Sequence, residues 1–541
     1  MKTVQTLIAL VIAAVVLAVA QPAPATITYS YGSNVDITSP TFWSPDTELI
    51  VFNTHNGGTK TSVESVYGPH SEANPIRIGG SDYGGQFMTF DGNYDLTFNG
   101  PLTIDGKSTA SGAIWERAEG VGVGFYSGTP LVTFTGGVSE TYAGAAFDKV
   151  GPGTLVLTGT STYTGETRIS GGALRAVDGV GIPATTPLFL NGGVFESNGS
   201  FTRSRGTSGG VIAWGYSSYT NGSGGFAAFG GPLTIDIDNN GPSNFSWNSH
   251  IIGLGWGSGD ATLIMNSVTA DSAVTFIDNL DISAGPDSDN IRNMRIDDNP
   301  ATTTDYVVFS GIWRGTNAAK VLVKAGAGRA DFDGDNTYAG STQVNAGTVN
   351  VNGATTGQGT YTVAIGATLG GTGTIGLASG AGVTVDGTLA PGLSVGRLTV
   401  SGGNVTFGET GVFRVEVNGL TAGTEYDQLV VTGGGVSLDG ELQLAFGPDF
   451  TVNPFDSLTL IDVQGTGVTT GTFQHVDDAF VGAFSGRRWR ITYDGDAVSG
   501  ALSGGNDVLL YAIPEPGVLG LLSVGGLALG GRRAARRRVG A

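Results

Sequence analysis

The sequence predicts an all-β protein with the architecture of a parallel β-solenoid, and three observations lead to this fold class. Glycine accounts for 92 of the 541 residues, and only 13% of the residues are charged. Short runs of Val, Ile, Leu and Thr alternate with Gly, Asn and Asp, which is typical of brief strands joined by tight turns. A segment near residue 150 recurs after 175 residues, and internal repeats are typical of stacked architectures.

The N-terminus has the order of parts of a secretory signal. A fourteen-residue apolar stretch follows Lys2, and Ala18 and Ala20 then form the small-x-small pattern of a cleavage site, with a second candidate at residues 23–25. The apolar stretch is too short for a comfortable membrane span. We therefore expect residues 1–25 to be a signal peptide, exported by the Sec machinery and removed by signal peptidase.

The internal repeat covers residues 149–174 and 324–349. A glycine-rich chain matches some glycines by chance, but not Lys, Thr and Tyr in one register. The recurring residues are Lys149, Gly151, Gly153, Gly159, Thr162, Tyr163, Gly165, Thr167 and Gly172 in the first copy, and Lys324, Gly326, Gly328, Gly334, Thr337, Tyr338, Gly340, Thr342 and Gly347 in the second.

These residues resemble the autotransporter-associated β-strand repeat of passenger-type proteins. The resemblance implies a right-handed parallel β-helix over residues 147–412, with the clearest copies at 147–177 and 322–352. In such a stack, inward Val and Leu side chains pack on the neighbouring coil, and glycines occupy the corners. The second copy departs at residues 329–332, where Arg-Ala-Asp-Phe replaces the expected Thr-Leu-Val-Leu, so the pattern does not support its first strand.

The regions on either side of the repeats are expected to be β-structure as well. Residues 26–146 form the predicted N-terminal β region. Residues 413–511 contain longer and more apolar runs, among them 413–417 and 458–462. We expect this region to be a β-rich C-terminal cap, because an uncovered solenoid end is an open sheet edge.

The C-terminus combines a short motif, an apolar run and a basic tail. Pro514, Glu515 and Pro516 precede the uncharged run 517–531, which as a helix spans only ~22 Å against a hydrocarbon core of ~30 Å. We expect a short transmembrane helix with the C-terminus in the cytoplasm, because arginines resist translocation. The tail arginines are Arg532, Arg533, Arg536, Arg537 and Arg538.

This order of parts resembles the PEP-CTERM sorting signal, here residues 512–541. The resemblance implies a substrate of an exosortase-like membrane enzyme that processes the tail. Six glycines weaken the predicted helix, which favours a transient anchor in the cytoplasmic membrane; a lasting tail anchor is the alternative. The expected location is the cell surface or the extracellular space.

Composition excludes several classes of function. Cysteine is absent, which rules out disulfides, thiolate metal sites and a cysteine nucleophile. The formal net charge of -20 disfavours nucleic acid as a partner, because an acidic surface repels phosphates.

Candidate chemistry is sparse. Asp331, Asp333 and Asp335 are weak calcium candidates, but the spacing of an EF-hand is absent and a solvated loop is the alternative. No catalytic residue and no cofactor site is predicted. The histidines lack the spacing of metal ligands and are His55, His70, His250 and His475.

Aromatic residues have two interpretations. We expect Tyr163 and Tyr338, at equivalent repeat positions, to pack at corners of the solenoid. Several tryptophans are expected either to be exposed and bind glycans or to pack between coils; these are Trp214, Trp247, Trp256 and Trp313.

Two functional classes remain. The first is an exported structural or adhesion-type protein of the cell surface or extracellular matrix, with extracellular polysaccharide as a further expected partner. The second is a polysaccharide lyase or glycoside hydrolase, since β-helices also carry such sites and fold alone does not decide function. The sparse charges favour the first class.

Overall fold

The structure is a computed structural model in which every described element is a β-strand, as the sequence predicts. It describes residues 95–104, 131–215, 222–247, 261–283, 290–474, 480–484 and 487–513, together with the strands 25–30, 34–36, 47–53, 61–65, 70–72, 76–79, 86–92 and 121–125. None of these residues belongs to a helix with the length and hydropathy that crossing a membrane requires.

The chain divides into two compact units, of which the first comprises residues 1–240 and 250–272. Sheet I of this unit has the order β1 (Ala25–Ser30), β3 (Thr47–Asn53), β6 (Ile76–Gly79), β9 (Leu102–Ile104) and β12 (Val138–Glu140). Sheet II has the order β2 (Asn34–Asp36), β4 (Thr61–Ser65), β7 (Gln86–Gly92), β10 (Val121–Phe125), β13 (Phe147–Val150), β15 (Thr167–Ile169), β17 (Leu188–Leu190), β20 (Val211–Trp214) and β19 (Ser204–Arg205). Sheet III contains β5 (His70–Glu72), β8 (Leu96–Phe98), β11 (Leu131–Phe134), β14 (Thr154–Leu157), β16 (Ala173–Ala176), β18 (Val194–Phe201) and β21 (Gly225–Ile235), and β23 (Thr262–Met265) follows in the chain.

The chain visits the three sheets of the first unit in turn. It passes through β6, β7 and β8, then β9, β10 and β11, then β12, β13 and β14. Successive strands of one sheet are parallel and in register, with Ile76 opposite Leu102 and Leu155 opposite Leu174. This is the connectivity of a solenoid, and it already holds within the predicted N-terminal region 26–146.

The second unit comprises residues 241–249 and 273–541. Sheet IV contains β24 (Val274–Phe276), β27 (Val307–Phe309), β30 (Arg329–Phe332), β32 (Thr348–Val351), β35 (Thr368–Gly371), β38 (Thr388–Pro391), β41 (Val412–Val417) and β44 (Glu441–Phe446). Sheet V contains β26 (Ile291–Ile296), β29 (Val321–Ala325), β31 (Ser341–Val344), β34 (Tyr361–Val363), β37 (Gly382–Val385), β40 (Asn404–Phe407), β43 (Val436–Leu438) and β46 (Thr469–Gly471). Sheet VI has the order β33 (Ala354–Gln358), β36 (Thr374–Leu377), β39 (Arg397–Ser401), β42 (Gln428–Thr432), β45 (Ser457–Gln464), β49 (Asp507–Ile513), β48 (Arg487–Gly495) and β47 (Phe480–Phe484), and a small sheet joins β22 (Asn244–Ser246), β25 (Asn279–Asp281) and β28 (Trp313–Arg314).

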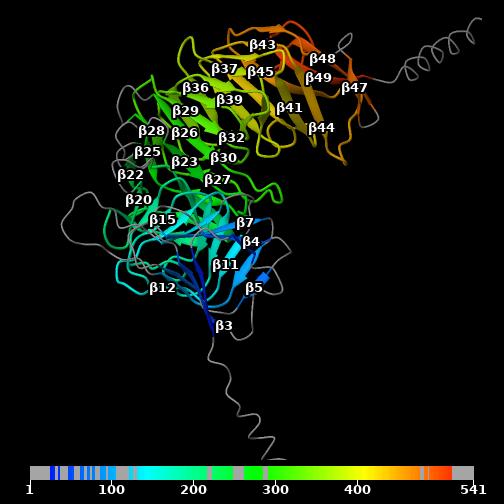
Figure 1. The fold of residues 1–541 in the computed structure, drawn as a ribbon. Helices are drawn as coiled ribbons and strands as arrows, with labels where there is room; N and C mark the ends of the chain where they lie inside the picture. Colours follow the sequence, from blue (N-terminus) through cyan, green and yellow to red (C-terminus); the bar gives the residue numbers. More distant parts are fainter. Residues whose placement is uncertain are drawn as a thin grey trace, which may run out of the picture. The chain divides into compact units, whose positions relative to one another are not determined.

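Stacked apolar side chains fill the interior of the second unit, and its strands follow one another like rungs in Figure 1. In β37 the buried residues Val383 and Val385 alternate with residues that face outward. Val383 lies opposite Val405 of the next coil, so each apolar side chain packs on its counterpart one coil away. Alternation of this kind places a core on one face of a strand and solvent on the other.

The second repeat copy forms its first strand in spite of the departure in sequence. Arg329–Phe332 is β30 and pairs in parallel with β27 and β32. Ala330 and Phe332 occupy the two inward positions and are buried, and the ring of Phe332 stacks on Phe309 with centroids 5.2 Å apart. The strand depends on these inward positions, which remain apolar.

The predicted cap, residues 413–511, contains two kinds of strand pairing. Parallel pairing continues through β41 with β44 and β43 with β46. Antiparallel pairing joins β45 to β49, β49 to β48 and β48 to β47. The change of pairing therefore begins near Ser457, well inside the predicted region, where the antiparallel strands extend sheet VI beyond the last coil.

Candidate functional site

The repeat lysine of the first copy is held by backbone carbonyl groups. Lys149 lies in β13 and its side chain is fully buried. Its ammonium donates hydrogen bonds to the carbonyl oxygens of Gly151 at 2.8 Å, Gly171 at 2.9 Å and Val150 at 3.2 Å. Gly151 and Gly171 belong to turns of successive coils, so one cation ties two neighbouring turns together.

The second copy builds the same arrangement. Lys324 in β29 is fully buried and donates to the carbonyl oxygens of Gly326 at 2.7 Å, Ala346 at 2.8 Å and Gly328. Ala346 belongs to the next coil, 22 residues after the lysine. We call each lysine with its three carbonyl partners a lysine cage.

Each cage satisfies the hydrogen-bonding capacity of a buried charge. An ammonium group has three donors and no acceptor, and burying it is costly unless its donors are paired. Burial lowers the pKa of Lys149 and of Lys324 to about 7, and nearby aspartates act in the opposite direction, Asp148 on Lys149 and Asp298 on Lys324. The carbonyl oxygens also favour the charged form.

The repeat glycine that follows each cage is required by close approach. Gly172 has φ +58° and Gly347 has φ +63°. A Cβ atom at Gly172 would lie 2.3 Å from the carbonyl oxygen of Gly153, and one at Gly347 would lie 2.3 Å from the ammonium nitrogen of Lys324. Glycine is required at this position because carbonyl oxygens of the preceding turn lie within 2.6 Å of the Cβ position in both copies.

The repeat tyrosines pack at corners, as the sequence predicts. Tyr163 and Tyr338 are buried, and their hydroxyl groups form hydrogen bonds with Thr167 at 2.6 Å and Thr342 at 2.8 Å. Both threonines recur in the repeat. Burial raises the pKa of both phenols above the ordinary value, so the tyrosines are neutral hydrogen-bonding groups of the core.

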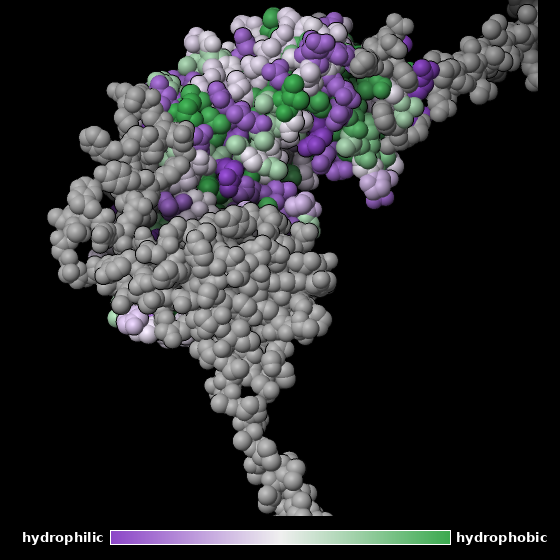
Figure 2. Space-filling model, in the orientation of Figure 1, coloured by the Kyte–Doolittle hydropathy of each residue, from purple (hydrophilic) through white to green (hydrophobic). Residues whose placement is uncertain are grey.

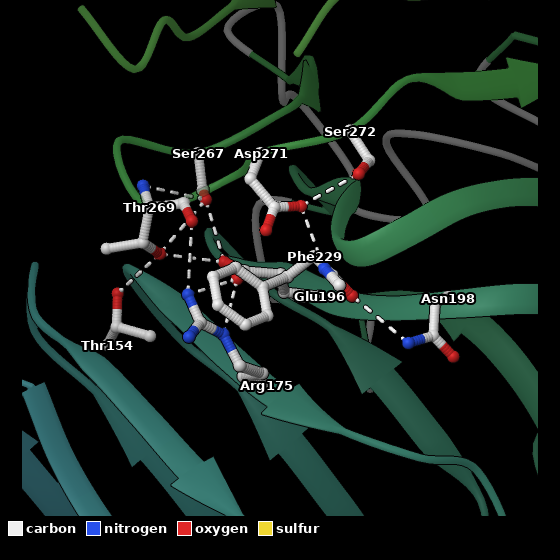
Figure 3. A network of polar contacts seen from close by, with 10 residues as sticks. Thr154, Arg175, Glu196, Asn198, Phe229, Ser267, Thr269, Asp271 and Ser272 are labelled. Carbon is white, nitrogen blue, oxygen red and sulfur yellow. Dashed lines mark hydrogen bonds and ion pairs between the residues drawn. The ribbon is translucent and has the colours of Figure 1, made fainter. Parts of the chain in front are cut away.

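A second polar cluster lies on the outer face of sheet III, beneath residues 266–272, which we call the strap (Figure 3). The carboxylate of Glu196 in β18 is fully buried. It accepts hydrogen bonds from Nε of Arg175 at 2.6 Å, from the hydroxyl of Ser267 at 2.8 Å and from the hydroxyl of Thr269 at 2.8 Å. The strap thus supplies two of the three groups that compensate this buried charge.

Further contacts close the cluster. The guanidinium carbon of Arg175 lies 3.2 Å from the centroid of the Phe229 ring, a cation–π contact. Thr154 forms a hydrogen bond with Thr269 at 3.1 Å. Beside these groups a set of apolar residues is buried: Ala173, Val194, Ala227, Ile264 and Ala270. The strap is therefore packed against the sheet, and its polar groups serve to hold it there.

The acidic cluster 331–335 does not converge on one point. Asp331 is buried in β30, forms an ion pair with Arg329 at 2.5 Å and accepts a hydrogen bond from Asn350. The exposed Asp333 and Asp335 accept hydrogen bonds from Asn352 and from the backbone N–H of Ala354 respectively. Among the described residues no three His, Asp or Glu side chains are grouped so that they could hold a metal ion, so the calcium hypothesis gains no support.

Of the two interpretations of the tryptophans, glycan binding by exposed rings is wrong for three of them. Trp214, Trp247 and Trp313 are at most 1% exposed. Trp247 and Trp313 pack edge to face with centroids 6.5 Å apart, and the indole of Trp214 donates to the carbonyl oxygen of Gly224. The alternative, packing inside the solenoid, is confirmed for these residues.

Other predicted site residues lie outside the described part of the chain. This holds for the cleavage residues Ala18 and Ala20, for the sorting residues 514–516, and for the tail arginines. It also holds for Trp256 and for the histidines except His70, which is in β5.

With this geometry established, comparison with known families identifies the repeats. Residues 147–176 and 322–351 each match the model of the passenger-associated-transport repeat. Each match begins at the first or second residue of the strand that carries the cage lysine, β13 or β29. It ends at the last residue of a strand in the next coil, β16 or β32. No curated protein matches the chain.

The chemistry of the passenger-associated-transport repeat is visible only in three dimensions. Its lysine and glycine recur in the sequence, but the acceptors of Lys149 and Lys324 are backbone carbonyls, which no sequence pattern marks. The Arg175–Glu196 pair gives no signal either, because its two residues are 21 positions apart and Glu196 lies outside the repeat.

Proposed function

We propose that this chain is an exported, surface-associated protein that acts as a non-enzymatic structural or adhesion-type scaffold. The observation that carries the proposal is the pair of passenger-associated-transport repeats, each joined to the next parallel coil by a lysine cage. Their family description links them to the transported passenger parts of proteins. A solenoid whose repeat residues link neighbouring coils is suited to present a binding surface rather than to perform chemistry.

Buried acidic groups support a structural role over catalysis. The carboxylate of Asp427 accepts two backbone hydrogen bonds, from Gly396 at 2.8 Å and Glu416 at 2.7 Å. Asp507 likewise accepts from Val463 and Ala497, both at 2.7 Å. Burial raises the pKa of both groups, but their oxygens are committed to the backbone, whereas a general acid must reach its substrate.

The proposal includes sorting through the C-terminal tail. Pro514, Glu515 and Pro516 would be recognised by an exosortase-like enzyme while the run 517–531 holds the protein in the cytoplasmic membrane. Support comes from the order of these parts and from the short span of the run. In the folded chain β49 ends at Ile513, so the proposed motif would follow directly on a folded strand.

Cell fractionation combined with intact mass measurement tests this function. We expect the native protein outside the cytoplasmic membrane with a mass that lacks both the signal peptide and the arginine tail. The variant Pro514→Ala/Glu515→Ala should keep its tail and remain in the membrane. The variant Pro448→Ala/Asp449→Ala, in an exposed turn between β44 and β45, should behave as the native protein does.

Two results would overturn the proposal. A native protein that keeps the arginine tail in the inner membrane contradicts sorting. Release of reducing or unsaturated ends from a panel of polysaccharides contradicts a non-enzymatic role, and would favour the lyase or hydrolase class instead.

A further inference from the structure

Sheet V carries a regular row of hydroxyl groups on its outer face. The strands β34, β37, β40, β43 and β46 are parallel neighbours, and their central outward residues lie directly opposite one another. All of these residues are exposed. We call them the hydroxyl ladder: Thr362, Thr384, Thr406, Ser437 and Thr470.

The ladder is geometrically regular because the buried residues next to it pack in the core and fix the positions of its strands. Val363, Val385 and Phe407 are buried in successive coils, so the outward residues between the buried positions repeat at the spacing of the strands. Neighbouring strands lie about 4.8 Å apart, and five rungs therefore extend over roughly 19 Å.

The hydroxyl groups of the ladder are largely free to bind a partner. Within the described residues, Thr362, Thr384 and Thr406 have no hydrogen-bond partner for their side chains. Thr470 donates to the carbonyl oxygen of Val436 over a long 3.5 Å. A hydroxyl group both donates and accepts, so each rung offers the same two functions that a sugar hydroxyl offers.

Glycines occupy the turns on one side of the ladder. The turns that precede the ladder strands contain glycines with positive φ: Gly380 at +87°, Gly402 at +91°, Gly433 at +72° and Gly465 at +88°. A Cβ atom at Gly380 or Gly465 would meet nothing within 4 Å. In Figure 2 the residues over β37 and β43 include many of near-neutral hydropathy. An extended ligand would therefore meet no side chain at Gly380 or Gly465, and the exposed Val468 borders the ladder next to β46.

Charge distinguishes between neutral and anionic ligands. The five ladder strands contain no lysine or arginine. Asp386 and Asp439 follow two residues after Thr384 and Ser437, and the whole chain carries a formal net charge of -20. Acidic groups beside the ladder repel polyuronates and phosphates, whereas they do not oppose an uncharged polymer.

We propose that the hydroxyl ladder of sheet V binds a neutral, unbranched polysaccharide that lies extended across the strands. The repeat of the ladder is close to the length of one sugar unit in an extended chain, so successive units meet successive rungs. The binding deepens the proposed surface function, on which it rests, and it names the face that holds the protein in a polysaccharide layer.

Affinity electrophoresis of the purified full chain tests the assignment. The gels contain a soluble neutral glucan, mannan or galactan, or a polyuronate. We expect at least one neutral polymer to retard the native chain more strongly than the polyuronate does. The variant Thr362→Val/Thr384→Val/Thr406→Val removes three hydroxyls at exposed positions and keeps β-branched side chains. Its affinity should fall by ~10-fold or more, because several modest hydrogen bonds are lost together.

Sheet IV supplies the matched control. Thr348, Thr368 and Thr388 also lie opposite one another on successive coils but are only half exposed. The variant Thr348→Val/Thr368→Val/Thr388→Val should bind as the native chain does. Thermal unfolding of all three proteins separates lost binding from lost structure.

Three results would overturn the assignment: no retardation in any neutral polymer, equal losses in both triple variants, or stronger retardation in the polyuronate. A dimer that only the sheet V variant abolishes in light scattering would assign the ladder to self-association instead. The sorting experiment is separate, because it measures the mass and location of the protein and requires no polysaccharide.

Discussion

The ammonium nitrogen of Lys149 lies 2.9 Å from the carbonyl oxygen of Gly171, which belongs to the next coil of the solenoid. The backbone hydrogen bonds of parallel strands already join neighbouring coils, and at the turn Ala173 donates to the carbonyl oxygen of Gly153 over 3.3 Å. A buried cation with carbonyl acceptors in two successive turns adds a side-chain link between them. The repeat thus encodes a staple between coils, and the following glycine leaves room for it.

Replacing Lys149 by methionine should destabilise the first unit. Methionine fills a similar volume but leaves the carbonyl oxygens of Gly151 and Gly171 without this donor. We expect a loss of about 1–3 kcal/mol in the free energy of unfolding, the range for buried polar groups that lose a partner. Urea denaturation measures it. Arg414→Met, at an exposed position of β41, should change stability by less than about 0.5 kcal/mol; equal values for the two variants would contradict the staple.

The cage lysines should make stability depend on pH in the alkaline range. Burial lowers the pKa of Lys149 and Lys324 from 10.5 to about 7. Between these values the unfolded chain binds more protons than the folded chain, so stability rises as the pH increases from about 7 to 10.5 and is insensitive to these groups below pH 7.

Denaturation midpoints across this pH range, for the native chain and for Lys149→Met/Lys324→Met, provide the measurement. The native chain should show the rise, and the double variant should show a smaller one. If the two profiles are parallel, the carbonyl oxygens hold the pKa of both lysines near its ordinary value, and the predicted pH dependence fails.

At acidic pH, Asp427 should make the stability of the folded chain decrease as the pH rises. Burial raises its pKa from 3.8 to about 7, so the folded chain holds a proton that the unfolded chain releases. Its contribution to stability is complete below pH 3.8 and is lost as the pH rises towards 7. In Asp427→Asn this loss should be absent. Comparing urea midpoints at pH 4 and pH 7 checks it; Asp449→Asn, at an exposed position, is the control and should keep the native pH difference.

The strap depends on the Arg175–Glu196 pair. Glu196→Gln keeps the shape of the side chain but removes the buried negative charge that Arg175 and two strap hydroxyls contact. Breaking a buried pair costs about 3–5 kcal/mol, so the midpoint of thermal unfolding should fall clearly. Limited proteolysis should cut the strap, residues 266–272, before other sites. Glu409→Gln, at an exposed position, should change neither; a strap that stays resistant in Glu196→Gln would contradict its dependence on this pair.

Most of the fold could be predicted from the sequence, because strand alternation and glycine turns are local signals. The corner role of Tyr163 followed from its place in the repeat. The first strand of the second copy could not be predicted, because Arg329–Phe332 does not match the repeat pattern. Its inward residues Ala330 and Phe332 are nevertheless apolar and buried. The cages and the strap could not be predicted either, because their partners are backbone carbonyls or residues that only folding brings together.

The glycine of the cage gives the sharpest test of this geometry. Gly347 has φ +63°, and a Cβ atom there would lie 2.3 Å from the ammonium nitrogen of Lys324 and 2.5 and 2.6 Å from the carbonyl oxygens of Gly328 and Ala327. Gly380 has φ +87°, but a Cβ atom there would meet nothing within 4 Å. Alanine at either position adopts an unfavourable backbone conformation, at a cost of roughly 1–2 kcal/mol. Only Gly347→Ala also displaces the cage lysine.

We therefore expect Gly347→Ala to lose more stability than Gly380→Ala, by about 1–3 kcal/mol for the displaced hydrogen bonds. In the background of Lys324→Met this excess should shrink, because the ammonium that the new methyl group would meet is gone, and a part should remain, because the carbonyl oxygens of Gly328 and Ala327 are still within 2.6 Å. Urea denaturation of the four single and double variants completes the comparison. An excess of unchanged size without the lysine would show that the glycine is required by these backbone carbonyls alone and not by the ammonium group.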